Sequence, residues 1–280
     1  MEKSRQRTEI LSKITDLEAK GLFDIDVEPD PPTIPLKPGQ IDYTYSKFKT
    51  KIKSEFANLI AKTYFDHQIK IGNLIIKEII GLENYLSVEH LGVMITANHF
   101  NPFDNYAVFK AIEKNLGRKR LYKIIREGNY TSFKGLYGFF FRNCNTLPIG
   151  SDIAVFKEFS KGIQTLLNRK EKILIYPEQA MWWNYKKPRP LKPGAFRFAA
   201  KFDAPVLPIF ITMEDSEKIG ADGFPVQAYT INILPPIFPK VELSVKENAK
   251  IMCEKNYKCW CECYEKFYGT PLTYNTKEGN

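Results

Sequence analysis

The sequence of 280 residues has few of the features that mark membrane-spanning or secreted proteins. No window approaches 18 uninterrupted apolar residues, so the sequence offers no candidate for a transmembrane helix. The first five residues lack the apolar core of a signal peptide. We therefore expect a cytoplasmic protein.

Cysteine is scarce as well, with five residues in the chain. Four of them follow the spacing C-x5-C-x-C-x-C within residues 245–268, where apolar residues recur at helical intervals. Zinc sites usually use gaps of two to four residues within a ligand pair, and a secreted disulfide framework is not crowded into one helix. We interpret this segment as a packing helix and expect no metal ion.

Basic residues are abundant: 41 Lys and Arg against 32 Asp and Glu give a net charge of +9. This excess favours anionic partners, such as nucleic acid, an anionic membrane surface, phosphorylated substrates or acidic carrier proteins. No recognisable nucleic-acid-binding module accompanies the charge, so we expect no nucleic-acid partner.

The chain divides into three parts by composition. Residues 8–20 have helical periodicity, and an acidic, proline-rich stretch follows that is typical of an extended linker. We expect residues 1–40 to form an arm outside the main fold. Residues 41–270 would form the main domain and residues 271–280 a C-terminal tail.

Strand-like and helix-like segments alternate through the main domain. This alternation predicts an α/β fold, a single domain with a mixed or mostly parallel sheet flanked by helices. The expected strands are residues 74–80, 92–97, 122–125, 147–149, 172–176, 205–211 and 229–234, and the expected helices are residues 105–115, 154–167, 195–202 and 245–268.

Residues 43–64 are basic and amphipathic. Two interpretations remain open: a helix packed on the core with a solvated basic face, or an interfacial helix with its apolar side in lipid headgroups. The apolar positions on one side are Phe48, Ile52, Phe56, Leu59 and Ile60, and lysines surround them.

The most informative stretch is where the apolar run of residues 92–97 ends at Asn98 and His99. Asp104 follows five residues after the histidine, with a proline between them. A strand running into a turn, with a helix starting near Asp104, would place the carboxylate against the imidazole. General base catalysis needs this arrangement, although the pair alone also fits a structural hydrogen bond.

A second buried strand, residues 173–176, also ends in polar residues. Ligands bind at strand ends in open α/β sheets, so Glu178 is expected to share a rim with His99. The alternative is a turn carboxylate without chemistry.

A third stretch starts a helix near Gly194, after Lys192. Three further cations precede it, at positions 186, 187 and 189. Cations and free N–H groups at a helix start together predict an anion site.

Two stretches are unusually aromatic, residues 135–141 and Trp182–Trp183. They would serve either as plain core or as walls of a groove for an acyl chain.

These stretches, in this order, resemble the glycerolipid acyltransferase family that acylates glycerol-3-phosphate and 1-acylglycerol-3-phosphate. The first block of the family, N-H-x-x-x-x-D, is matched by Asn98, His99 and Asp104, after a typical G-L-E-N at residues 81–84. The third block, F-P-E-G-[ST]-R, is matched only through Tyr176, Pro177 and Glu178. The fourth block fits at Lys192, Gly194, Ala195 and residues 205–209, and the second block is partial, at residues 138–142 and 147–149.

The resemblance covers about residues 70–212 and implies a glycerol-3-phosphate acyltransferase-like fold. It implies that His99 removes the proton of an acceptor hydroxyl, that Asp104 orients the imidazole, and that neither a cofactor nor a serine or cysteine nucleophile is needed. The donor would be a CoA or acyl-carrier-protein thioester, and the acceptor a lysophospholipid such as 1-acylglycerol-3-phosphate. The setting would be phospholipid biosynthesis at the inner face of the cell membrane.

The departures concern the acceptor. The family's phosphate-holding arginines of the second and third blocks are absent here. Either neighbouring cations substitute, or the acceptor is a phosphate-free glycolipid or polyol; a catalytically idle lipid-binding relative is a further alternative. The predicted substrate-binding residues are Glu178, Gln179, Arg142, Lys123, Lys192 and Gly194, and Lys186, Lys187 and Arg189 are further candidate cations.

Overall fold

The computed structural model describes residues 3–29 and 32–276. Asp30 and Pro31 of the expected linker and residues 277–280 of the expected tail lie outside the described residues. The helices are α1 (Arg5–Ala19), α2 (Phe48–Lys70), α3 (Leu82–Leu86), α4 (Asp104–Ile112), α5 (Glu127–Ser132), α6 (Gly135–Asn143), α7 (Ile153–Asn168), α8 (Gly194–Lys201) and α9 (Val245–Tyr268). The strands are β1 (Ile75–Ile80), β2 (Val93–Ala97), β3 (Leu121–Arg126), β4 (Thr146–Ile149), β5 (Lys172–Ile175), β6 (Val206–Ile219) and β7 (Pro225–Ile233).

One seven-stranded sheet forms the centre of the molecule, in the order β1-β7-β6-β2-β5-β3-β4. The five strands from β6 to β4 are parallel, whereas β7 is antiparallel to β6 and β1 is parallel to β7. The expected α/β fold with a mostly parallel sheet is therefore confirmed. All five residues of β2 are buried, as a central parallel strand covered on both faces requires.

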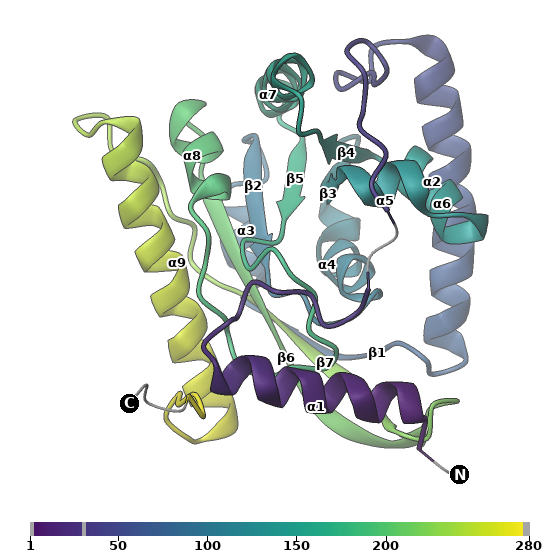
Figure 1. The fold of residues 1–280 in the computed structure, drawn as a ribbon. Coiled ribbons are helices and arrows are strands. Elements are labelled where there is room, and N and C mark those ends of the chain that lie inside the picture. Colours follow the sequence, from purple (N-terminus) through teal and green to yellow (C-terminus); the bar gives the residue numbers. More distant parts are fainter. Residues whose placement is uncertain (1–2, 30–31, 277–280) are drawn as a thin grey trace.

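Helices cover both faces of this sheet (Figure 1). Val93 and Ile95 of β2 join the core on the side of α2, α3, α4 and α6. Met94 points to the opposite side and joins the core formed with α7, α8 and α9. Alternate residues of one strand thus enter separate cores, and the carboxyl end of β2 emerges between two helical layers.

The orientation of α2 resolves one open alternative. The side that packs on the core buries three small residues, Ser54, Ala57 and Ala61, together with Phe65. Four of the five apolar positions expected on one side are exposed instead, and only Ile60 packs against the core. The exposed four are Phe48, Ile52, Phe56 and Leu59, at 76%, 49%, 61% and 63% exposure. α2 therefore packs on the core, as one interpretation held, but through a different side from the one expected.

The N-terminal segment does not stand apart from the fold. α1 lies across the molecule beside the strands β6 and β7 (Figure 1). Its residues Ile10, Ile14 and Leu17 form one buried cluster with Trp182 and Trp183. The two tryptophans are therefore core residues that pack against the N-terminal helix. The division into an arm and a domain at residue 41 stays a prediction.

The C-terminal helix spans Val245–Tyr268, as expected. Ser244 and Glu247 form a capping box at its start, and Trp260 and Tyr264 are buried along it. All five cysteines are free thiols. Among the residues with described positions, no three His, Cys, Asp or Glu side chains are arranged to hold a metal ion.

If α1 is part of the cooperative fold, the buried and exposed leucines of this helix will differ in their effect on stability. Leu17 is 8% exposed and Leu11 is 37% exposed. We expect Leu17→Ala to lower the free energy of unfolding by about 2–4 kcal/mol, because it leaves a cavity against the tryptophans. Leu11→Ala should cost less than about 1 kcal/mol. Urea unfolding measures both; equal small effects would mean that α1 is a separate arm.

Candidate active site

The end of β2 is fixed by the side chain of Asn98. Its amide nitrogen donates to the carbonyl of Ile211 at 3.0 Å, and its amide oxygen accepts from the N–H of the same residue at 2.8 Å. This pair of bonds continues the strand pairing with β6 by one residue. His99 therefore leaves the sheet edge in a defined direction.

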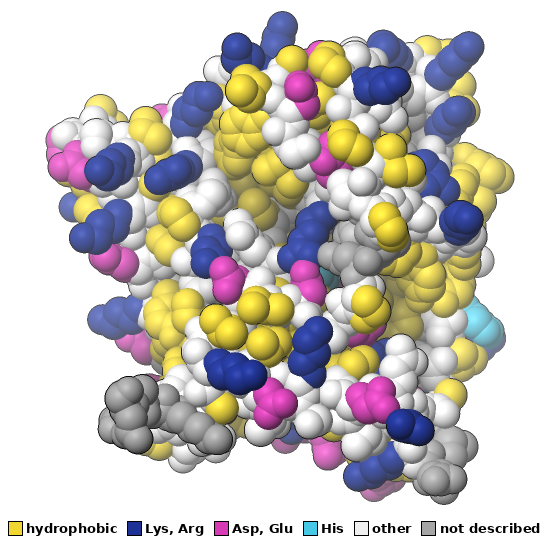
Figure 2. Space-filling view, in the orientation of Figure 1, with side chains coloured by type: hydrophobic (Ala, Val, Ile, Leu, Met, Phe, Trp, Pro, Cys, Tyr) yellow, Lys and Arg dark blue, Asp and Glu magenta, His cyan; other side chains and the backbone are white. Residues whose placement is uncertain are grey.

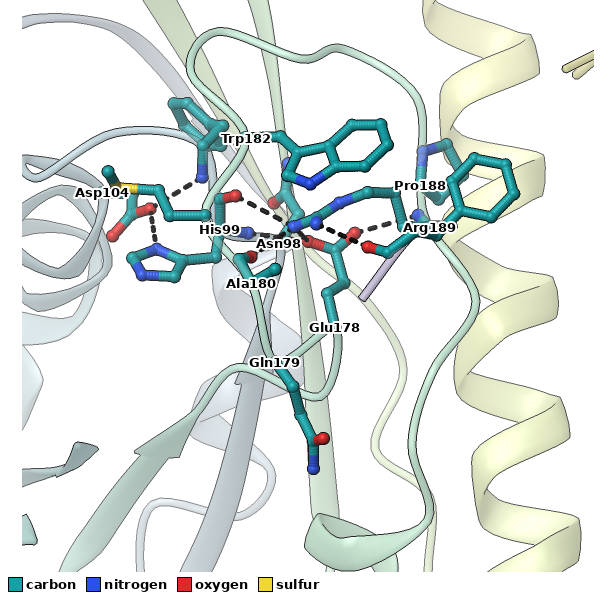
Figure 3. A network of polar contacts seen from close by, with 12 residues as sticks. Asn98, His99, Asp104, Glu178, Gln179, Ala180, Trp182, Pro188 and Arg189 are labelled. Atoms are coloured by element: carbon teal, nitrogen blue, oxygen red, sulfur yellow. Dashed lines mark hydrogen bonds and ion pairs between the residues drawn. The ribbon is translucent and has the colours of Figure 1, made fainter. Parts of the chain in front are cut away.

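His99 and Asp104 are in contact, as predicted (Figure 3). Nδ1 of His99 lies 2.7 Å from Oδ2 of Asp104, which is completely buried at the start of α4. The same oxygen accepts the backbone N–H groups of Phe100 and Asn101 at 3.1 and 3.2 Å. A carboxylate oxygen that receives N–H donors acts as an acceptor, so Nδ1 carries the proton and Nε2 is left to accept one. The imidazole side chain is 27% exposed, which makes it accessible.

Tyr176 completes this group, and the sequence analysis gave it no role. Its hydroxyl donates to Oδ1 of Asp104 at 2.6 Å. Its ring stacks on the His99 imidazole, with centroids 4.0 Å apart and planes 17° apart. Burial and the neighbouring Asp104 raise the pKa of Tyr176 well above its ordinary value, so the phenol remains a donor. The sequence signal that could have indicated a role for Tyr176 is its place in the third block, where the family normally has phenylalanine.

Glu178 lies beside His99, as predicted, but it faces the protein interior. Oε2 accepts the backbone N–H of His99 at 3.0 Å and an Arg189 guanidinium N–H at 2.7 Å. Oε1 accepts the backbone N–H of Arg189 at 2.9 Å. Glu178 and Arg189 are 2% and 1% exposed, so this is a buried ion pair that positions the histidine loop.

Arg189 also ties several chain segments together. Its guanidinium donates to the carbonyls of His99 at 3.2 Å, Ala180 and Phe23, and it lies over the ring of Trp182. Arg189 is therefore fully engaged by protein groups and is not available to bind a substrate phosphate.

The other predicted binding residues near this loop lie on its surface. Gln179 has a left-handed backbone, φ 62°, and its exposed side chain points away from the ion pair (Figure 3). Lys192 Nζ forms an ion pair with Asp24 at 2.6 Å. Gly194 begins α8 with no atom within 4 Å of the position that a Cβ would occupy, which leaves open space there.

Arg142 and Lys123 belong to other surroundings. Arg142 donates to the carbonyls of Tyr130 and Phe133 and lines a surface cavity with residues 34–40 of the N-terminal segment. Lys123 lies on β3 beside Cys144, and burial lowers its pKa. The structure thus brings His99, Asp104 and Glu178 together, while these two cations lie in separate environments.

The histidine and its buried carboxylate, at the end of a strand, form a base that can deprotonate a hydroxyl. Comparisons with known proteins indicate which class of protein the chain resembles. A protein-family model described as Acyltransferase matches residues 78–212 of the chain. Its structure is similar to the crystal structure of the 1-acyl-sn-glycerophosphate (LPA) acyltransferase PlsC from Thermotoga maritima. The TM-score is 0.51 and the identity 18%, over 80% of this chain and 81% of that chain. A comparison with curated proteins gave no match.

Tyr176→Phe keeps the ring stacked on His99 but removes the hydroxyl from Asp104. Asp104 then has one donor fewer and stabilises the imidazolium more strongly. We expect the acid limb of the pH–rate profile to move to higher pH by up to about two units, since such a bond is worth about 1.5–3 kcal/mol and about 1.4 kcal/mol equals one unit. The rate near neutrality should fall because more of the histidine is then protonated. Tyr85→Phe is the matched control, because the buried Tyr85 hydroxyl has no hydrogen-bond partner among the described residues. Identical profiles for wild type and Tyr176→Phe would remove Tyr176 from the catalytic group.

Proposed function

We propose that the protein is an O-acyltransferase that moves a fatty acyl group from a CoA or acyl-carrier-protein thioester to a hydroxyl of a lipid acceptor. The observation that carries the proposal is the 2.7 Å contact of His99 Nδ1 with the buried Asp104 carboxylate. This contact leaves Nε2 as a base at the accessible edge of the sheet. A neutral imidazole nitrogen that can accept a proton suits general base catalysis.

The reaction balances without a protein nucleophile. Nε2 of His99 takes the proton of the acceptor hydroxyl as its oxygen attacks the thioester carbonyl carbon. Asp104 stabilises the resulting imidazolium, as the carboxylate of a catalytic triad does. The tetrahedral intermediate collapses, the C–S bond breaks, and the imidazolium returns its proton to the leaving sulfur. The products are the ester and the free thiol.

Two acceptor classes fit this chemistry. Resemblance to the glycerolipid acyltransferases implies a lysophospholipid such as 1-acylglycerol-3-phosphate. The charge pairing around His99 favours the second class, a phosphate-free glycolipid or polyol, because Arg189 and Lys192 already have carboxylate partners.

Thiol release from an acyl-CoA or acyl-carrier protein, measured with a panel of lysolipid and monoacylglycerol acceptors, tests the assignment. His99→Ala should lower the rate by a factor of about 10²–10⁴, the usual contribution of a general base. His90→Ala is the matched control, since His90 is exposed. Equal thiol release by wild type and His99→Ala would contradict the assignment and favour a lipid-binding protein without turnover.

We also propose that α2 places the enzyme on an anionic membrane surface. Among the residues that the structure describes, every helix is too short or too polar to cross a bilayer. Hydrophobic side chains nevertheless gather along the side of the molecule where α2 runs, with Lys and Arg around them (Figure 2). They include Phe48, Ile52, Phe56 and Leu59 of α2 and Leu136 and Tyr137 of α6, and the exposed lysines nearby are Lys47, Lys49, Lys51 and Lys53. Apolar area flanked by lysines fits an interfacial helix on anionic lipid.

Phe56→Ser combined with Leu59→Ser tests this surface. Burying the two side chains in lipid contributes about 1.5–3 kcal/mol each, so binding to vesicles containing phosphatidylglycerol should weaken more than tenfold. Ile153→Ser is the control, because Ile153 is 74% exposed on the separate helix α7. Co-sedimentation measures all three proteins. Unchanged binding of the double variant would exclude α2 as the docking surface.

A further inference from the structure

A short piece of the N-terminal segment, residues 23–28, lies against the loop of residues 177–193 that follows β5; we call these the strap and the site loop. The Phe23 carbonyl accepts from Arg189 at 3.0 Å, and the Ile25 carbonyl accepts the indole N–H of Trp182 at 2.8 Å. Val27 is buried in the cluster that holds Trp182 and the apolar side of α1. The strap is therefore built into the wall of the site.

The strap carries two carboxylates toward the site. Asp24 forms an ion pair with Lys192 Nζ at 2.6 Å, and this bond lowers the pKa of Asp24. Asp26 forms an ion pair with Arg126 at the end of β3 and accepts the N–H of Met181 at 3.3 Å. Acidic and basic side chains accordingly alternate across the middle of this face (Figure 2).

The two cations that meet the strap contact the chain on either side of Glu178. Arg126 also donates to the carbonyl of Gln179, the residue after Glu178, whose carboxylate binds the backbone N–H of His99. The backbone N–H of Lys192 donates to the carbonyl of Pro177 at 2.8 Å, on the other side of Glu178. An acceptor whose hydroxyl reached His99 and whose headgroup extended over the chain at Glu178 would meet these pairs.

The remaining basic side chains of the site loop are also matched by carboxylates. The sequence of the loop has four basic residues. They pair as Lys186 with Asp215 at 3.8 Å, Lys187 with Glu18 at 2.6 Å, Arg189 with Glu178 at 2.7 Å and Lys192 with Asp24 at 2.6 Å. Two of these four carboxylates come from residues 1–29, so the N-terminal segment neutralises the site loop.

From this pairing we infer that Asp24 and Asp26 determine acceptor specificity: the strap excludes an acceptor with a phosphate headgroup and admits a neutral polyol lipid. A phosphate would meet two carboxylates whose cationic partners are already engaged, and like charges repel each other. The hydroxyls of a glycerol or sugar can instead donate to the same carboxylates. This inference rests on the proposed acyl transfer and names its acceptor class.

The backbone of the strap is held by buried contacts on both sides of Asp26. Asp26 stands between Ile25, whose carbonyl is bonded to Trp182, and Val27, which is 3% exposed. Phe23 stacks on Trp182 with ring centroids 5.8 Å apart. These contacts fix the backbone of the strap on both sides of Asp26, so the strap keeps its position beside the site loop.

The experiment compares acyl transfer to a monoacylglycerol and to the 1-acylglycerol-3-phosphate with the same chain. We expect wild type to have a kcat/KM at least tenfold higher for the monoacylglycerol. In the double variant Asp24→Asn and Asp26→Asn, the ratio of kcat/KM for the phosphate acceptor to that for the neutral acceptor should rise at least tenfold. Glu28→Gln, on the same strap but paired with Arg7 at 2.6 Å, should keep the wild-type ratio. A wild-type preference for the phosphate acceptor, or an unchanged ratio in the double variant, would overturn the inference.

Binding of sn-glycerol 3-phosphate, measured by titration calorimetry, tests the effect of Asp24 and Asp26 on phosphate binding without turnover. The double variant should bind it at least tenfold more tightly than wild type, because the two strap carboxylates no longer repel the phosphate and Lys192 loses its ion pair. Equal binding, or tight binding by wild type, would overturn the role of the strap. Absence of thiol release with every acceptor would instead refute the acyl transfer itself, while the calorimetric comparison still tests Asp24 and Asp26.

Discussion

The buried ion pair of Glu178 and Arg189 is the interaction on which the site depends. Glu178 fixes the backbone of His99, and Arg189 bonds the carbonyls of His99 and Phe23. The pair therefore joins the ends of β2 and β5 to the N-terminal strap. Removing one partner of such a pair usually costs about 3–5 kcal/mol, because the other charge remains buried without compensation. Both charges must therefore be kept for the catalytic loop to hold its shape.

Pairing of cations with carboxylates, as in Glu178 and Arg189, also lets the chain combine a high net charge with a site whose charges are matched. The chain carries a net charge of +9, yet Arg126, Arg189 and Lys192 around the site are matched by Asp26, Glu178 and Asp24. Part of the excess positive charge lies instead on α2, whose lysines surround its exposed apolar side chains. The catalytic edge and the basic helix thus have different electrostatic environments. The first environment underlies the neutral acceptor that we propose, and the second underlies the proposed docking on an anionic surface.

The parts of the site that could be predicted from the sequence are local. His99 and Asp104 lie five residues apart across one turn, and Glu178 directly follows a buried strand, so strand-end reasoning found all three. Arg189 is eleven residues beyond Glu178 in an irregular loop, and Asp26 is 155 residues from Met181, its backbone donor. No local periodicity tells which carboxylate will meet which cation over such separations. The buried side of α2 was missed for a related reason: small residues let a helix approach the core closely, and hydrophobicity patterns give them little weight.

The strap owes its position to contacts on both sides of it along the chain. Before it, α1 is held by the tryptophan cluster; after it, the N–H of Leu36 donates to Glu127 and the hydroxyl of Tyr43 donates to the carbonyl of Pro148. Asp24 and Asp26 are thus placed by a chain anchored at two distant points of the fold. The contacts that stabilise the N-terminal segment are consequently the same ones that set the charge at the catalytic edge. If the strap carboxylates select the acceptor as we propose, a substitution that loosens α1 will act on acceptor choice as well as on stability, even though no residue of α1 touches His99 in the contacts described.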